Sequence, residues 1–311
     1  MHIIDKLAQR IERVNNPTVM GLDTQVSHLP KEFSALHRTP AQGILAYNRA
    51  LLEGLADIVP CVKVQIAYYE MLGLEGMEAF SKTLKMAREM GYVVIADAKR
   101  NDIGATATAY AAAFFEKGAD FECDILTVNG YLGRDGIEPF TKYAPEKGIF
   151  VLCRTSNPSA GDLQDTGGDE QDYARMGRLV AGMDGKVGDL ATAPQRVYER
   201  MGCLIEDWGK DTVGERGYSA VGAVVGATWP EQSVALRKAH PSTFFLVPGY
   251  GAQGGTAKDL AGCFDAKGGG AVVNASRSLL AAWQKQDTDD FVSAARREAL
   301  DMQKALREAT T

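Results

Sequence analysis

The sequence predicts an α/β fold, a (β/α)8 TIM barrel with a long insertion after the fifth strand, formed as one domain by residues 1–311. Two observations indicate this fold. Eight short apolar runs have the composition of β-strands, and segments with helical spacing lie between them. Alternating strands and helices form parallel sheets, and eight strands suffice to close a barrel. An open doubly wound sheet would usually have fewer strands and a glycine-rich first turn.

The expected strands are rich in β-branched side chains. They cover residues 18–22, 61–65, 92–96, 121–128, 149–153, 221–227, 244–247 and 271–274. Between them, apolar residues three and four apart predict helices, as at Leu51 and Leu55 or at Phe80 and Leu84. The last such pattern, over residues 291–306, predicts an amphipathic helix that packs on the outside of the barrel.

One connection is much longer than the others. After the fifth strand, residues 157–219 form an insertion rich in Gly and Asp, with helical patterns around residues 173–180 and 195–201. Long connections that follow strands lie at the C-terminal mouth of a barrel, where active sites are built. The insertion is therefore a candidate for a lid or an oligomer contact, and a surface excursion without function is the alternative.

The composition excludes several classes of protein. The formal net charge is −6 and like charges do not cluster, which argues against a nucleic acid polymer or an anionic membrane as partner. The five cysteines are scattered and contain no Cys-X-X-Cys pair, so we expect free thiols in a reducing compartment. The sequence has neither the apolar core of a signal peptide nor an apolar window of about 18 residues. We therefore expect a cytoplasmic protein.

Charged residues follow the first three strands. The third strand ends in Asp97 and Lys99, which are two apart and therefore point to the same side, and Asp102 lies in the following loop. Lys63 lies within the second strand and Asp23 follows the first. Solvated rim charges are the alternative for any one of these residues. Charges at the C-terminal ends of three consecutive strands indicate a catalytic face.

The seventh and eighth strands carry the features of a phosphate site. After the seventh strand comes the loop 248–256, with the sequence Pro-Gly-Tyr-Gly-Ala-Gln-Gly-Gly-Thr, whose glycines allow backbone N–H groups to approach a phosphate. Arg277 follows the eighth strand at the start of a helix, where both its fork geometry and the helix N-terminus favour phosphate. A glycine-rich loop alone is usually an ordinary turn, but its position opposite Arg277 favours an anion site.

Together these motifs resemble the orotidine 5′-phosphate decarboxylase family over nearly the whole chain. The resemblance rests on Asp97-X-Lys99-X-X-Asp102-Ile103, on Lys63 before it, and on the glycine-rich loop after it. The long fifth connection and the run Lys-Val-Gln-Ile-Ala-Tyr-Tyr-Glu from Lys63 are similar to the longer bacterial branch. The resemblance implies decarboxylation of orotidine monophosphate to UMP and CO2, in de novo pyrimidine biosynthesis, by a homodimer with shared active sites and without metal or cofactor.

The resemblance also implies roles for the charged residues. Asp23 and Lys63 would lie near the ribose, and Asp97 and Lys99 at the reacting edge of the pyrimidine. No motif for a metal, pyridoxal or thiamin is visible to act as an electron sink, so the protein itself must stabilise the carbanion at C6. Lys99 would place its ammonium there and donate the proton, while Asp97 and Asp102 keep that lysine protonated and oriented.

Further residues match the family at its other contacts. Asp102, Ile103 and Thr106 would reach across a dimer interface into the neighbour's site. Ser156 matches the serine that reads the pyrimidine.

The phosphate contacts of the family match Gln253 and Arg277. Ser276 stands where a short-loop relative would have glycine, which leaves the backbone contact at that position open.

Two other interpretations remain open from the sequence. Keto-gulonate phosphate decarboxylases and hexulose phosphate synthases share the Asp-X-Lys-X-X-Asp motif, and their resemblance implies a Mg²⁺ site with a carboxylate on the second strand. Lys63 occupies that position here, and a cation argues against Mg²⁺. A non-catalytic nucleotide-binding barrel is the second alternative, because a fold alone does not establish catalysis.

Overall fold

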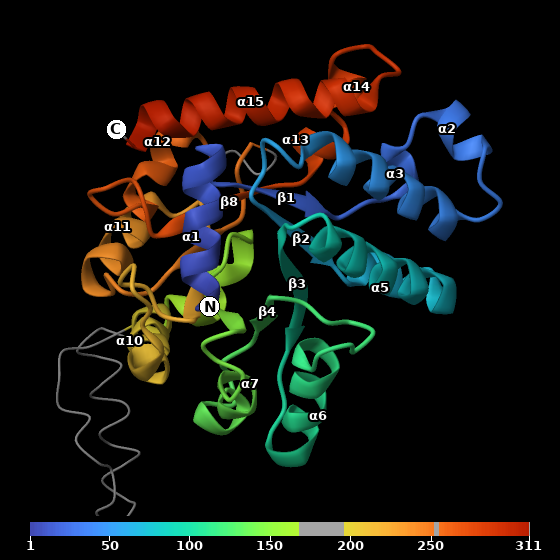
Figure 1. The fold of residues 1–311 in the computed structure, drawn as a ribbon. Helices are drawn as coiled ribbons and strands as arrows, with labels where there is room; N and C mark the ends of the chain where they lie inside the picture. Colours follow the sequence, from blue (N-terminus) through green and yellow to red (C-terminus); the bar gives the residue numbers. More distant parts are fainter. Residues whose placement is uncertain (168–195, 252–254, 311) are drawn as a thin grey trace, which may run out of the picture.

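The structure is a closed barrel of eight parallel strands that pair in sequence order (Figure 1). It is a computed structural model and describes residues 1–167, 196–251 and 255–310. The strands are β1 (Thr18–Leu22), β2 (Cys61–Gln65), β3 (Val93–Arg100), β4 (Ile125–Val128), β5 (Gly148–Arg154), β6 (Val221–Val225), β7 (Phe245–Val247) and β8 (Ala271–Ala275). The predicted (β/α)8 barrel is confirmed, and every expected strand overlaps an observed one.

Helices surround the strands and account for most of the remaining chain. The longer ones are α1 (Ile3–Val14), α3 (Pro40–Leu55), α5 (Gly73–Glu89), α6 (Gly104–Phe115), α10 (Val197–Gly209), α11 (Pro230–Ala239) and α15 (Phe291–Thr310). The shorter ones are α2 (Lys31–Ala35), α4 (Ala67–Glu70), α7 (Glu138–Thr141), α8 (Gly161–Gln164), α12 (Ala257–Leu260), α13 (Arg277–Leu280) and α14 (Ala282–Lys285). No described helix is long and apolar enough to cross a membrane.

Two hydrophobic layers hold the barrel together. Inside it, α1 places Ile3, Ile4 and Leu7 against strand residues such as Ile95 and Phe150, so this helix closes the end of the barrel opposite the mouth. A larger layer lies between the outer faces of the strands and the surrounding helices. Because strand residues alternate in direction, one face of each strand fills the interior and the other supports a helix.

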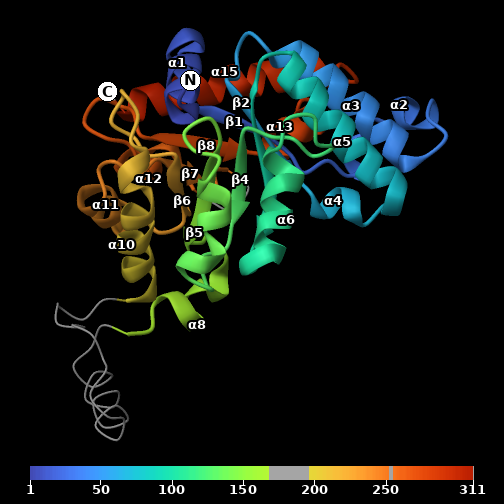
Figure 2. The same ribbon diagram turned by 60° about the horizontal axis from the view of Figure 1, so that its bottom comes forward.

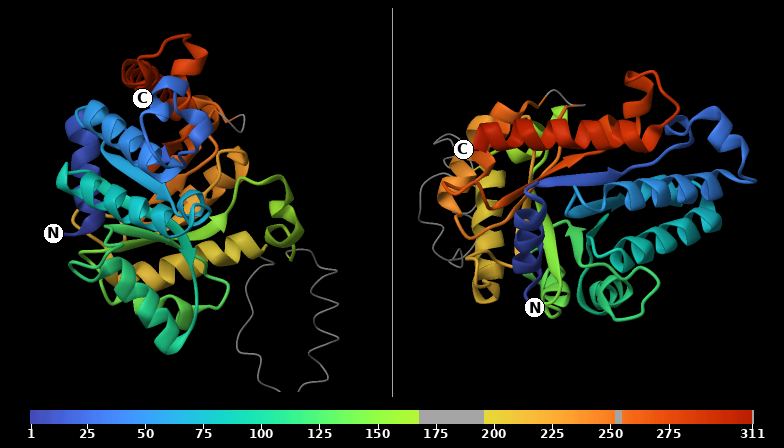
Figure 3. Two further views of the ribbon diagram at one scale, coloured as in Figure 1. Left: turned by 90° about the vertical axis from the view of Figure 1, so that its right-hand side faces the viewer. Right: turned by 45° about the horizontal axis from the view of Figure 1, so that its top comes forward.

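The C-terminal helix packs on the outside of the barrel, as its amphipathic pattern predicts. α15 runs beside α3 and α13 along the outside of the barrel (Figure 3). The ring of Phe291 at its start stacks on that of Tyr47, with 4.4 Å between the ring centres. The buried face of α15 also includes Met302 and Leu306.

The long connection after β5 contains two described parts. α8 follows directly, after a short 3-10 turn (Pro158–Ala160). Farther along, α10 packs against β5 and β6 and forms part of the barrel wall (Figure 2). The helical pattern expected around residues 173–180 lies outside the described residues.

The third strand extends farther than expected. Its pairing with β4 is interrupted between Ala96 and Arg100, where the register shifts. Lys99 within this stretch has a backbone φ of 48°. A non-glycine residue in this left-handed region is uncommon and concentrates at functional sites, where the surrounding structure stabilises it.

Candidate active site

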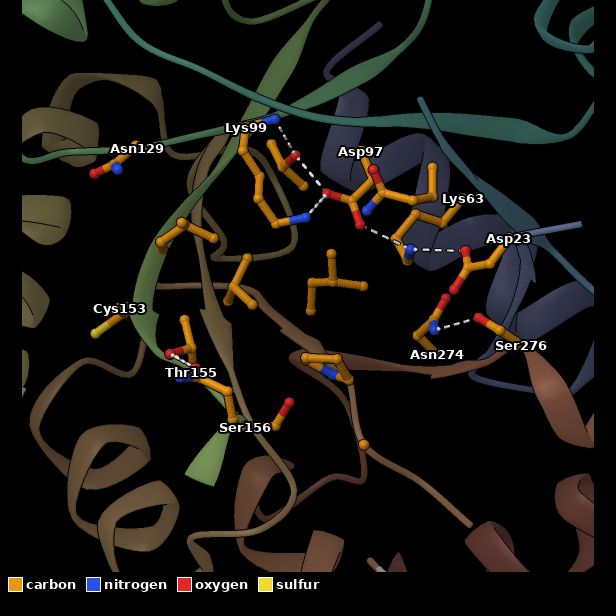
Figure 4. A pocket seen from close by; sticks show the side chains of 18 of the residues that line it. Asp23, Lys63, Asp97, Lys99, Asn129, Cys153, Thr155, Ser156, Asn274 and Ser276 are labelled. Atoms are coloured by element: carbon orange, nitrogen blue, oxygen red, sulfur yellow. Dashed lines mark hydrogen bonds and ion pairs between the residues drawn. The ribbon is translucent and has the colours of Figure 1, made fainter. Parts of the chain in front are cut away.

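A cavity of about 680 Å³ opens at the C-terminal ends of the strands. Six residues expected at the site line it, namely Asp23, Lys63, Asp97, Lys99, Ser156 and Arg277. They come from or directly follow β1, β2, β3, β5 and β8, so segments far apart in the sequence meet at one mouth. In Figure 4 the charged residues Asp23, Lys63 and Asp97 lie along one side of the cavity, and Thr155 and Ser156 lie across from them.

The charged residues form a continuous row of alternating sign. The Lys63 ammonium lies 2.8 Å from Asp97 Oδ2 and 3.5 Å from Asp23 Oδ1. The Lys99 ammonium lies 2.7 Å from Asp97 Oδ1. The register of the barrel produces this row, because β1, β2 and β3 end at similar heights around the mouth.

The two buried members of the row, Lys63 and Asp97, keep their charges. Lys63 is 5% exposed and Asp97 is 7% exposed. Burial alone would favour the neutral forms, but the carboxylates of Asp23 and Asp97 raise the pKa of Lys63 above its ordinary value. Burial likewise opposes the charge on Asp97, yet Lys63 and Lys99 lower the pKa of this carboxyl well below its usual range. Asp97 is therefore a carboxylate held between two ammonium groups.

Thr127 completes this arrangement, and it was not among the residues expected from the sequence. Its hydroxyl donates a hydrogen bond of 2.9 Å to Asp97 Oδ1 and accepts one of 3.0 Å from the backbone N–H of Lys99. These two bonds support the left-handed backbone of Lys99 and orient the carboxylate that faces its ammonium. The available signal was a polar residue inside the apolar fourth strand, one strand away from the charged motif.

Asp102, Ile103 and Thr106 do not line this cavity. They lie at the start of α6, where Asp102 Oδ1 accepts a hydrogen bond of 2.8 Å from the N–H of Ile103. Ile103 is 54% exposed and Thr106 is also exposed. Their expected position in a neighbour's site stays a prediction, which a single chain does not test.

The end of the cavity that is expected to hold the phosphate contains Arg277, Pro248, Gly249 and Tyr250. Among the described residues, no carboxylate pairs with the exposed guanidinium of Arg277. Gly249 has a φ of 102°, which directs the chain away from β7 in a conformation that favours glycine. Gln253, the other expected phosphate contact, lies outside the described residues.

β8 adds two polar groups to the same end. Asn274 Nδ2 donates a hydrogen bond of 3.1 Å to Ser276 Oγ, and both residues line the cavity (Figure 4). This pair packs closely on β1, since a Cβ placed on Gly21 would lie 2.0 Å from Ser276 Oγ. A side chain at position 21 would therefore displace the end of β8 and the start of α13.

The described residues contain no group of three or more His, Cys, Asp or Glu side chains that could hold a metal ion. At the mouth, Lys63 occupies the space between the two carboxylates Asp23 and Asp97.

Comparison with known proteins agrees with this geometry. Residues 45–288 match the model of the "Orotidine 5'-phosphate decarboxylase / HUMPS family". A protein of Clostridium perfringens named orotidine 5′-phosphate decarboxylase is 41% identical over 310 residues, which is 99% of both chains. One of the same name from Clostridium botulinum is 42% identical over 98% of this chain and 99% of its own.

A solved structure of a protein with a related sequence has the same fold. The structure of Leishmania donovani OMP decarboxylase superposes with a TM-score of 0.71 at 29% identity, covering 99% of this chain and 100% of the other. The family match covers β2 and β3, which carry Lys63, Asp97 and Lys99, and the end of β8. The chain therefore belongs to the orotidine 5′-phosphate decarboxylase / HUMPS family.

Proposed function

We propose that this protein converts orotidine monophosphate to UMP and CO2 without metal or organic cofactor, with Lys99 as the proton donor. The observation that carries the proposal is the row Asp23–Lys63–Asp97–Lys99, which is buried at Lys63 and Asp97 and shares one cavity with Arg277. An ammonium group at one end and a guanidinium at the other suit a ligand with a reacting anionic centre and a distant phosphate.

The reaction places its main demand on C6 of the pyrimidine. When the bond from C6 to the carboxylate breaks, CO2 leaves and the electron pair remains on a carbon that the ring stabilises poorly. An ammonium about 4 Å away stabilises this charge by about 4 kcal/mol at an effective dielectric constant near 20. Lys99 then transfers a proton from Nζ to C6 to give UMP, and solvent restores the proton on the lysine.

Asp97 supports this step through Lys99. Because Asp97 stays ionised, its Oδ1 accepts a hydrogen bond from the neighbouring ammonium and orients it toward one point. Lys63 balances the second oxygen of Asp97, so this carboxylate is held in place from both sides. Asp23 and Lys63 lie farther along the row, where we propose that they contact the ribose.

We also propose a homodimer with shared active sites. Large apolar side chains are exposed on the segments that follow β2, β3 and β4, including Met71 at 70%, Leu74 at 90%, Ile103 at 54% and Tyr131 at 76%. Large apolar side chains that are exposed in the single chain are often covered at subunit interfaces. In this dimer Asp102, Ile103 and Thr106 would enter the partner's cavity.

We further propose a cytoplasmic location. All five cysteines lie in the described part of the chain, none of them forms a disulfide there, and four are buried. Cysteines that do not form disulfides are typical of proteins in a reducing compartment.

The direct test is turnover in a buffer with chelator. Purified protein is mixed with orotidine monophosphate, the loss of the orotate ultraviolet band is followed, and UMP is identified as the product. Rapid loss in chelator supports the proposal. Activity only after addition of Mg²⁺, and only on a sugar phosphate, would instead support the metal-dependent branch. Binding of UMP without turnover would support a non-catalytic barrel.

A further inference from the structure

A buried arginine lies next to the residue expected to read the pyrimidine. Arg154 at the end of β5 is fully buried, and its guanidinium lies 4.1 Å from the ring centre of Trp229 and 5.3 Å from that of Tyr198. Its Nη2 donates a hydrogen bond of 3.0 Å to Asp165 Oδ2. A buried arginine with an ion pair and two aromatic faces is held rigidly. The proposed chemistry does not use it.

Gln164 of α8 links this arginine to the cavity. Its Oε1 accepts hydrogen bonds from Arg154 Nη1 at 3.3 Å and from the N–H of Thr155 at 3.0 Å. Its Nε2 donates to Thr155 Oγ1 at 2.7 Å. The reversed amide would direct its NH2 group toward two donors, so the network determines the orientation. Gln164 also lines the cavity itself.

The other side of the same turn is held by the segment after β6. Trp229 Nε1 donates a hydrogen bond of 2.9 Å to the carbonyl of Thr155, and Thr228 Oγ1 donates one of 3.3 Å to the carbonyl of Ser156. A Cβ on Gly226 would lie 2.8 Å from Ser156 Cα, which shows how closely the two segments approach. The turn that presents Ser156 is therefore bound on one side by Gln164 and on the other by Trp229.

We infer that Gln164, oriented by Arg154, is a positioning residue that holds the Thr155–Ser156 turn in the conformation that recognises the pyrimidine ring. The inference rests on the proposed function, because that function assigns the ring to Ser156. The inference explains why the fully buried Arg154 directly precedes the turn that would recognise the pyrimidine. Without Gln164 the N–H of Thr155 loses its acceptor, and the Thr155 hydroxyl loses one donor and keeps only its bond to Asn157 Oδ1. The turn then gains freedom that ring binding must remove.

The experiment compares two ligands that differ by the ring. Dissociation constants of UMP and of ribose 5-phosphate are measured by calorimetry for the wild type, Gln164→Ala and Gln164→Glu. For Gln164→Ala we expect UMP to bind about tenfold more weakly, because the loss of one or two hydrogen bonds has an effect of about this size. The dissociation constant of ribose 5-phosphate should stay unchanged. Gln164→Glu keeps an acceptor for Arg154 and Thr155 but loses the donor, so its UMP affinity should be intermediate.

Two further variants separate positioning from general stability. Gln303→Ala removes a glutamine whose Nε2 donates hydrogen bonds to the carbonyls of Val14 and Asn15. This change should alter neither the affinity for UMP nor that for ribose 5-phosphate. In a Ser156→Ala background, Gln164→Ala should have a smaller effect on UMP than in the wild type, because both changes act on one turn.

Three results would overturn the inference. One is an unchanged UMP affinity in Gln164→Ala, and another is an equal weakening of both ligands. The third is full additivity with Ser156→Ala. Failure of the proposed function appears separately, as a wild-type protein without turnover of orotidine monophosphate. If that protein still binds UMP, the comparison of variants stands, and if it does not, both proposals fall.

Discussion

Replacing Lys99 by alanine tests the proposed reaction most directly. The change removes the ammonium that lies 2.7 Å from Asp97 Oδ1, and with it the proposed proton donor. The lost charge stabilisation is about 4 kcal/mol for a pair at 4 Å and an effective dielectric constant near 20, or about a thousandfold in rate. Loss of proton transfer adds a factor of about 10² to 10⁴. We therefore expect kcat to fall by about 10⁵ or more.

The fold and the binding of product should survive this change. The Lys99 side chain is 47% exposed, so its removal leaves no buried cavity. The carboxylate of Asp97 keeps Lys63 at 2.8 Å and the hydroxyl of Thr127 at 2.9 Å. UMP binding, measured by calorimetry, should remain detectable.

The assay is the loss of the orotate absorbance under saturating substrate, with enzyme concentration raised to follow slow turnover. Lys82→Ala is the control, because Lys82 is half-exposed and pairs with Glu78 on α5, outside the cavity. This control should turn over like the wild type. A Lys99→Ala protein that retained more than about a hundredth of the wild-type rate would refute the reasoning, since neither charge stabilisation nor proton transfer could then depend on Lys99.

Three further changes test other parts of the structure. Arg277→Ala should weaken the binding of UMP by about 10- to 150-fold, because hydrogen bonds to a charged group contribute about 1.5–3 kcal/mol. The affinity for uridine, which lacks the phosphate, should stay unchanged when both are measured by calorimetry. Gly21→Ala should lower the free energy of unfolding in urea by about 1–3 kcal/mol, since its Cβ would lie 2.0 Å from Ser276 Oγ. Glu122 is partly buried, which opposes its charge, but the hydrogen bond from Arg88 and further donors lower its pKa to about 2. A lowered carboxyl pKa contributes stability above the unfolded value of 4.5 that is lost as the pH falls toward 2. As the pH falls between these values, the free energy of unfolding of the wild type should therefore decrease by on the order of 2 kcal/mol more than that of Glu122→Gln. An equal decrease for the two proteins, measured by urea unfolding at each pH, would contradict this.

The local patterns of the sequence were sufficient for the barrel. β1 and β2 begin and end at the residues expected from their largely apolar runs, because a buried parallel strand is mostly apolar on both faces. β4 begins at Ile125, later than its apolar run, since Phe121 packs on Phe80 and Phe114 outside the sheet. Aromatic residues in a loop and in a strand look alike when only neighbours along the chain are known.

The charged row was also predictable, since Asp97 and Lys99 share one strand and Lys63 and Asp23 belong to the strands before it. The residues that support this row could not be predicted. Thr127 joins the row from β4, and the left-handed backbone of Lys99 arises where the pairing of β3 with β4 shifts register. A hydrogen bond between residues thirty positions apart leaves no local pattern.

The sequence by itself determined the type of fold, the order of its strands and the charges at the mouth, because these follow from periodicity and from residues close together in the chain. Only the tertiary structure decided which polar groups support those charges. Gln164 and Trp229 hold Thr155 from opposite sides, and they come from the segments after β5 and after β6. Such contacts depend on the closure of the barrel, which brings distant segments to hydrogen-bonding distance and has no counterpart in the spacing of residues along the chain.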